Sequence, residues 1–188
     1  MGRLICEFSM SLDGYVAGPG VSHDTPMGEG GEALHDWMFA ADAGPDNARA
    51  KREMVERTGA VILGRRTFDL GIAHWDGTPF PVPSFVLSHR PPPAHLAEGF
   101  VFVDAGIDAA LRLAREAAGA RDVRLMGAHV ARQYLASGQV EELTVQLVPL
   151  LLGGGEPLFP GELALRLQPT ECTATAQVTH LRYTVPRE

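Results

Sequence analysis

Residues 122–138 read DVRLMGAHVARQYLASG, and this stretch indicates the fold more clearly than any other part of the chain. DVRLM (122–126) is a short apolar run typical of a buried strand, and Gly127 follows it directly. The next residues form an apolar stripe at helical spacing, made of Val130, Ala131, Tyr134 and Leu135. The stretch therefore predicts a strand, a glycine turn and a helix in direct succession.

The chain before this stretch repeats the same alternation of short apolar runs and helical patterns. Further strands are predicted at 3–10, 60–63, 84–88 and 99–104. Helices are predicted over 32–42, over 46–59 with Asp46 as N-cap and Gly59 just after the last turn, and over 107–119, which Gly119 ends. This alternation is typical of a mainly parallel sheet that helices cover on both faces.

The C-terminal third departs from the alternation. Residues 140–151 and 173–185 alternate apolar and polar side chains, which predicts half-exposed strands at an antiparallel edge. No linker divides the chain, and we expect residues 1–188 to form a single α/β domain with an antiparallel C-terminal ribbon. The glycine-rich segment 19–31 is expected to be a loop, either over a site or simply at the surface.

Composition and charge exclude several classes of protein. A net charge of −7 argues against broad nucleic-acid binding, which needs a basic face. Neither a signal peptide nor an apolar run long enough to span a membrane is evident, so we expect a cytoplasmic protein. The two cysteines are far apart in the sequence and the histidines are scattered, so no metal is expected.

Three predicted strands end in residues that suit phosphate groups. The first is followed by Gly64, Arg65, Arg66 and Thr67, the second by Ser88, His89 and Arg90, and the third by Gly127 and Ala128 at a helix start. Ligands of parallel sheets lie beyond the carboxyl ends of the strands, and arginines and helix N-termini bind phosphate oxygens. Each group alone has an ordinary explanation, since an arginine after a strand is often solvated and a glycine before a helix is often a turn. Segment 150–159 (LLLGGGEPLF) lacks the residues of a phosphate-binding loop and is read as a turn or bulge between strands.

The order of these segments resembles the dihydrofolate reductase-like family, and within it the group typified by the reductase domain of riboflavin biosynthesis (RibD C-terminal-like). The resemblance extends over nearly the whole chain. It rests on SMSLDGYVAG (9–18), GAVILGRRTFD (59–69), SFVLSHRP (84–91), the long segment 123–159 and HLRYTV (180–185). It implies a three-layer fold with a mostly parallel central sheet, an antiparallel C-terminal ribbon and helices on both faces.

The resemblance also implies a site for NADPH. The segment after the first strand would contact the nicotinamide through Met10, Asp13, Val16 and Ala17. The cofactor phosphates would be bound by Gly64, Arg65, Arg66 and Thr67, and the adenosine side by Leu87, Ser88, His89 and Arg90. The pyrophosphate would lie on the helix that begins with Gly127, Ala128, His129 and Val130.

One residue departs from the family pattern. Family members usually carry Gly-Gly where this chain has Gly127-Ala128, and in dihydrofolate reductases that pair is joined by a cis bond. The alanine leaves open whether the cis geometry and the full cofactor affinity are kept.

The resemblance points to Asp36 as the carboxylate beside the substrate, with His35 as the next candidate; a solvated aspartate is the ordinary alternative. Asp13 is a second candidate, whose alternative role is to form a turn. The expected function is reduction of a C=N or C=O bond in a small pterin-like or pyrimidine-like heterocycle. A non-catalytic sensor of a nucleotide or heterocycle is the alternative, and an oligomerisation module is a third. A homodimer is expected in each case.

Overall fold

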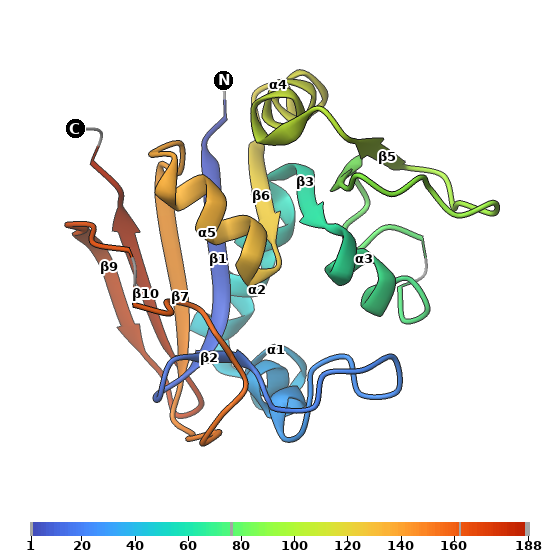
Figure 1. Ribbon diagram of the computed structural model, residues 1–188. Coiled ribbons are helices and arrows are strands. Elements are labelled where there is room, and N and C mark those ends of the chain that lie inside the picture. Colours follow the sequence, from blue (N-terminus) through green and yellow to red (C-terminus); the bar gives the residue numbers. More distant parts are fainter. Residues whose placement is uncertain (1, 76, 162, 187–188) are drawn as a thin grey trace.

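A central sheet of eight strands runs through the computed structural model, which describes residues 2–75, 77–161 and 163–186 (Figure 1). The strand order is β5-β4-β3-β6-β1-β7-β10-β9. The strands are β1 (Leu4–Ser11), β3 (Thr58–Gly64), β4 (Ser84–Leu87), β5 (Phe100–Val103), β6 (Asp122–Met126), β7 (Glu142–Val148), β9 (Gln168–Ala174) and β10 (Thr179–Thr184). Strands β5 to β7 in this order are mutually parallel, whereas β10 is antiparallel to both of its neighbours. The predicted parallel sheet with an antiparallel C-terminal ribbon is confirmed.

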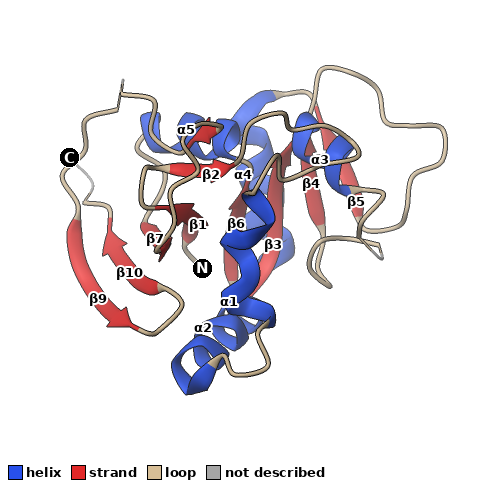
Figure 2. Ribbon diagram, turned by 90° about the horizontal axis from the view of Figure 1, so that it is seen from below, coloured by secondary structure: helices blue, strands red, loops and turns tan. Residues whose placement is uncertain are grey.

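Helices lie on both faces of this sheet. Figures 1 and 2 show α4 (Gly106–Ala118) and α5 (Ala128–Ala136) on one face and α2 (Gly44–Arg57) on the other. The remaining helical segments are a 3-10 turn over Gly31–His35, α1 (Asp36–Phe39) and α3 (Arg65–Gly71). The three-layer arrangement expected from the resemblance is therefore confirmed. In the described part of the chain no helix has the length and apolar character needed to cross a membrane.

The main apolar core lies between the sheet and the α4–α5 layer. The predicted stripe of α5 faces it, and all four of its side chains are buried. The Tyr134 hydroxyl donates to the Ile107 carbonyl at 2.6 Å, which ties α5 to the start of α4. Helix α4 ends at Gly119, as predicted, where a φ of 62° favours glycine.

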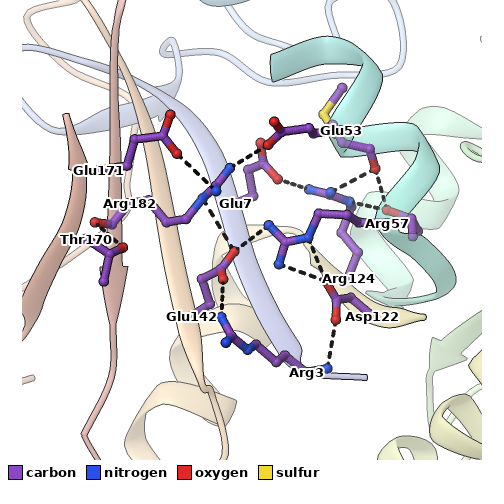
Figure 3. A network of polar contacts seen from close by, with 12 residues as sticks. Arg3, Glu7, Glu53, Arg57, Asp122, Arg124, Glu142, Thr170, Glu171 and Arg182 are labelled. Atoms are coloured by element: carbon purple, nitrogen blue, oxygen red, sulfur yellow. Dashed lines mark hydrogen bonds and ion pairs between the residues drawn. The ribbon is translucent and has the colours of Figure 1, made fainter. Parts of the chain in front are cut away.

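The opposite face of β1, β7 and β10 is polar and yet buried beneath α2. On β7, Glu142, Thr144 and Gln146 are at most 6% exposed. Figure 3 shows the ion pairs of this layer: Arg182 of β10 lies among Glu53, Glu142 and Glu171, and Arg124 of β6 pairs with Glu7 of β1 at 2.5 Å. The prediction of a half-exposed antiparallel strand over 140–151 is therefore wrong, because β7 is an inner strand parallel to β1 whose polar side faces charged groups instead of water.

Two helix predictions need correction. Helix α2 begins after Ala43, so Asp46 lies in its first turn and is not the N-cap. Gly59 is not a helix stop, because the chain turns from α2 into β3 at Thr58. Gly59 instead permits close packing, since a side-chain carbon there would come within 2.9 Å of Ala118. The predicted helix over 32–42 is divided into the 3-10 turn and the short α1.

The structure contains short elements that the sequence patterns do not predict. Residues 173–185 were predicted as one strand. They contain the end of β9, the hairpin turn and the whole of β10. Strands β2 (Tyr15–Ala17) and β8 (Glu156–Pro157) form a small second sheet. Strand β8 lies within the segment expected to be a turn between strands.

Candidate active site

The three strand ends singled out from the sequence are neighbours in space. Strand β3 lies between β4 and β6, with Gly64 opposite Leu87 and Leu63 opposite Met126. Figure 2 looks onto this edge of the sheet from the carboxyl ends of the parallel strands. The residues that follow β3, β4 and β6 therefore begin from one edge, which is where ligands of parallel sheets bind.

Two glycines allow the ends of β3 and β6 to approach closely. Gly127 has a φ of 89°, and a side-chain carbon there would overlap the Thr67 hydroxyl. A side-chain carbon at Gly64 would lie 3.0 Å from a methyl group of Val130. Glycine at both positions therefore lets the turn after β3 and the start of α5 pack directly against each other.

Arg65 and Arg90 meet on one carboxylate. Arg65 Nε lies 2.6 Å from Asp69 Oδ1, and an Arg90 terminal nitrogen lies 2.8 Å from Asp69 Oδ2. Arg65 is also held by the Pro91 carbonyl at 2.9 Å and lies over the rings of Phe68 and Phe102. Two guanidinium groups, one from the start of α3 and one from the turn after β4, thus face the same region, and their remaining N–H groups suit phosphate oxygens.

The Ser88 hydroxyl shapes the turn that carries Arg90. It accepts from the Arg90 backbone N–H at 3.0 Å and donates to the Arg90 carbonyl at 2.8 Å. Leu87 and Ser88 are half-buried, while His89 and Arg90 are exposed. The turn therefore presents the two basic side chains outward from the end of β4.

Helix α5 begins at the end of β6 without a side-chain cap. Gly127 is its N-cap, Ala128 and Val130 are buried, and His129 is exposed. The first N–H groups of a helix that lack a capping side chain bind anions well. No cis peptide bond occurs among the described residues, so Gly127 and Ala128 are joined by a trans bond.

Arg66 and Arg132 lie on either side of Glu156. Arg132 is 2.9 Å from a Glu156 oxygen and donates to the Pro157 carbonyl at 2.7 Å, whereas Arg66 is 3.7 Å from Glu156 and its side chain is 68% exposed. Arg132 therefore holds β8 in place through two hydrogen bonds, whereas most of the Arg66 side chain is accessible to solvent.

The segment after β1 lies beside the main core. Met10 packs against the core cluster that includes Val16, and Ala17 pairs with Glu156 across the small sheet. Asp13 accepts from the Ser11 hydroxyl at 2.6 Å and from the backbone N–H groups of Leu152 and Gly153. The hydrogen bond from Ser11, together with those from the backbone, lowers the pKa of Asp13. Asp13 therefore holds the 150–155 loop, which matches its turn-forming alternative more closely than a proton-transfer role.

The glycine-rich segment 19–31 is an ordered loop. Backbone bonds from Gly18 to Met27 and from Glu29 to Pro19 close it into a narrow arch. The His74 ring nitrogen Nε2 lies 3.4 Å from the His23 carbonyl, so the arch touches the segment that follows α3.

Asp36 and Trp37 are adjacent but have different surroundings. Asp36 begins α1 and is exposed, and burial lowers the pKa of its neighbour His35. Trp37 is 2% exposed, and its indole N–H donates to the Ser9 hydroxyl of β1 at 3.0 Å. Since Ser9 precedes Met10, this bond joins α1 to the strand that carries the predicted nicotinamide contact.

Two buried residues next to Trp37 were not found from the sequence. The His180 ring lies edge-on to Trp37 with ring centres 5.1 Å apart, and His180 Nε2 donates to the Asn47 side chain at 2.8 Å. Burial lowers the pKa of His180 and favours its neutral form. In the sequence, His180 is one polar residue of an alternating strand and Asn47 is one polar residue of a polar helix. Both patterns are also typical of residues that face water.

A pocket of about 380 Å³ lies between α1 and α2. Trp37 and Met38 of α1, Asn47 and Lys51 of α2, and alanine and glycine residues of the loop and the start of α2 line it. Its volume is within the range of small-molecule sites, roughly 300–1,000 Å³. Within the described residues no group of three or more side chains has the composition of a metal site.

Comparison with known proteins identifies the family. The family described as the RibD C-terminal domain matches residues 3–181. The chain belongs to the RibD C-terminal domain family. A relative outside the solved structures is the uncharacterized protein YwjB of Bacillus subtilis strain 168, which is 23% identical over 95% of this chain and 96% of that protein.

Solved structures share the RibD-type fold. A protein of Shewanella sp. PV-4 assigned to riboflavin biosynthesis has a TM-score of 0.77 at 23% identity and covers 98% of this chain and 99% of its own. A pyrimidine reductase-like protein of Corynebacterium diphtheriae has a TM-score of 0.65 at 15% identity, and the match covers 100% of this chain and 93% of that one. The bifunctional deaminase and 5-amino-6-(5-phosphoribosylamino)uracil reductase of Thermotoga maritima has a TM-score of 0.64 at 13% identity, with 98% of this chain and 57% of that one covered. At these identities the likeness establishes the fold.

Proposed function

We propose that this protein is an NADPH-dependent reductase that transfers a hydride to a C=N or C=O bond of a small pyrimidine-like or pterin-like heterocycle. The observation that carries the proposal is the meeting of Arg65 and Arg90, from two separate strand ends, at the ligand-binding edge of the sheet. Membership of the RibD C-terminal domain family supports the reductase class.

The residues at this edge fit a dinucleotide with an extra phosphate. The uncapped N–H groups of α5 would bind the pyrophosphate, with Thr67 and Arg66 beside them. Ser88, His89 and Arg90 would bind the adenosine side, where Arg65 and Arg90 can take the 2′-phosphate that distinguishes NADPH from NADH. Gly127 lets the Thr67 hydroxyl lie against the start of α5.

NADPH, when bound, supplies the hydride, and the chain supplies orientation and a proton. Met10, Val16 and Ala17 would position the nicotinamide on the apolar side of β1. Trp37 and Asn47 are almost fully buried on the α2 side of the sheet, so the heterocycle would instead lie beside the nicotinamide at the carboxyl end of β1. Asp36, or His35 next to it, would deliver the proton to the reduced nitrogen or oxygen.

A pyrimidine-like substrate is favoured over a folate because the solved structures named above include a pyrimidine reductase-like protein and a uracil reductase. Those names apply to those proteins, and for this chain the heterocycle is our proposal.

A non-catalytic sensor is the second candidate. The observation that favours it is the exposed carboxylate of Asp36, which has no hydrogen-bond partner among the described residues and so is not held toward a reacting atom.

Turnover separates the two candidates. Purified protein is mixed with NADPH and a panel of aminopyrimidines and pterins, and the loss of nicotinamide absorbance is followed. Oxidation that depends on one of these compounds and falls in Asp36→Asn supports the reductase. Saturable NADPH binding without oxidation by any compound in the panel supports the sensor.

A further inference from the structure

Asp69 sits between the two arginines of the proposed cofactor site with one oxygen on each. It belongs to α3, one turn after Arg65, and faces Arg90 from the end of β4. Two arginines and one carboxylate leave a net charge of +1 where two arginines alone would give +2. The carboxylate thus takes one contact from each arginine that a phosphate could otherwise accept.

The two arginines are held to different degrees. Arg65 is fixed by Asp69, by the Pro91 carbonyl and by two aromatic rings, and its side chain is 19% exposed. The Arg90 side chain is 65% exposed, and its one hydrogen bond in the described structure goes to Asp69. Arg90 is therefore the group that can rotate toward a ligand, and its rotation leaves the Asp69 Oδ2 atom without a donor.

A carboxylate and an arginine beside the adenosine ribose favour different nicotinamide cofactors. A carboxylate accepts from the 2′-hydroxyl of NADH, whereas an arginine binds the 2′-phosphate of NADPH. This site contains both. A 2′-phosphate bound by Arg65 and Arg90 would lie close to the Asp69 carboxylate, and the two like charges repel.

We propose that Asp69 is a specificity-determining residue that reduces the preference for NADPH over NADH and provides the acceptor for the 2′-hydroxyl of NADH. The inference rests on the proposed function, since it assumes that the adenosine ribose binds at Arg65 and Arg90. NADPH still binds more tightly than NADH, but the ratio of the two affinities is smaller than the two arginines without Asp69 would give.

The test is the ratio of the two dissociation constants in Asp69→Asn. Asparagine keeps the size of the side chain and an oxygen that accepts from Arg65, but it removes the charge. We expect NADPH to bind about three- to fivefold more tightly and NADH to bind more weakly, because partly exposed charge pairs contribute on this scale. Glu116→Gln, which alters an exposed carboxylate on α4, is the matched control and leaves both constants unchanged.

The outcomes distinguish this inference from the proposed function. Opposite changes for the two cofactors support the assignment, since a folding defect would weaken both. An unchanged ratio, or parallel weakening of both cofactors, overturns the role of Asp69 and leaves the reductase proposal intact. If the wild-type protein binds neither cofactor, the proposed function fails, and the specificity role fails with it. Competition by adenosine 2′,5′-bisphosphate against NADPH, stronger in Asp69→Asn, checks that the effect lies at the adenosine end.

Discussion

The Thr67 hydroxyl lies in the space that a side chain at Gly127 would occupy. This contact joins the turn after β3 to the turn after β6, although 60 residues of sequence separate the two positions. Because Gly127 also has a φ of 89°, the position excludes side chains both by space and by backbone conformation. The relationship fixes where α3 and α5 begin relative to one another, and therefore where the proposed phosphate donors lie.

Gly127→Ala tests this contact against a matched glycine. Gly138 also has a positive φ, of 68°, but has open space around its missing side chain. Either substitution should cost about 1–2 kcal/mol of unfolding free energy from the backbone conformation. Only Gly127→Ala should also displace Thr67 and weaken NADPH binding by roughly tenfold or more, measured by fluorescence titration. Equal NADPH affinities in the two variants would contradict the account.

The buried bond between Trp37 and Ser9 is tested by a double-mutant cycle. Ser9→Ala leaves the indole N–H buried without an acceptor, which should cost about 1–3 kcal/mol of unfolding free energy. Trp37→Phe removes both the donor and part of the ring, and Ser9→Ala in that background should cost less. We expect a coupling free energy of roughly 1 kcal/mol from denaturant unfolding. Strictly additive effects would show that the bond does not join α1 to β1.

Glu142 is expected to be the most sensitive carboxylate of the polar layer. It lies 2.8 Å from both Arg3 and Arg57, and its side chain is 4% exposed. Glu142→Gln removes the charge partner of Arg3 and one of the two carboxylates that pair with Arg57, which keeps Asp122, and should cost about 2–3 kcal/mol in a thermal or chemical melt. In the control Glu116→Gln, the ion pair with Arg112 is exposed, and the expected loss is below about 0.5 kcal/mol. Similar losses in the two variants would contradict the burial of the layer.

The carboxyl groups of the same layer should make the free energy of unfolding depend on pH. Burial opposes ionisation of Glu142 and Glu53, but hydrogen bonds and charges from Arg57 and Arg182 outweigh it and lower the pKa of each carboxyl below 4.5. The unfolded chain then binds more protons than the folded one, so stability rises with pH in that range. The stabilisation should be complete above pH 4.5 and be lost as the pH falls through the lower pKa values of the folded state. Denaturant melts at a series of pH values measure this slope, which should be smaller in Glu142→Gln; an equal slope in that variant would refute the assignment.

The sheet and the meeting of the three strand ends at one edge could be predicted from the sequence because both depend on local patterns. Buried parallel strands are nearly continuous apolar runs, and DVRLM matches β6 at both ends. The glycines and arginines after the strands follow the rule that ligands bind at this edge. The turns after β3 and β6 lie close together, as the contact of Thr67 with Gly127 shows, because these two strands are neighbours in the sheet. Local patterns do not give this strand order, and it was expected only from the family resemblance.

The polar layer could not be predicted for a physical reason. The alternation of Glu142, Thr144 and Gln146 is the same whether the polar side faces water or a charged helix. Helix α2 is itself strongly polar, with Asn47 as its buried residue, so nothing in its pattern indicates that it covers a sheet. Asn47 and His180, and the pocket beside Trp37, were missed for the same reason, because pairing between distant polar residues leaves no local pattern.

The most direct test of the account is titration of the purified protein with NADPH, followed by nicotinamide fluorescence and by melting temperature. We predict saturable NADPH binding that Arg65→Ala and Arg90→Ala each weaken by roughly tenfold or more, while Arg112→Ala on α4 leaves it unchanged. An absence of saturable binding, or binding that neither arginine affects, would contradict the assignment of this edge as a cofactor site.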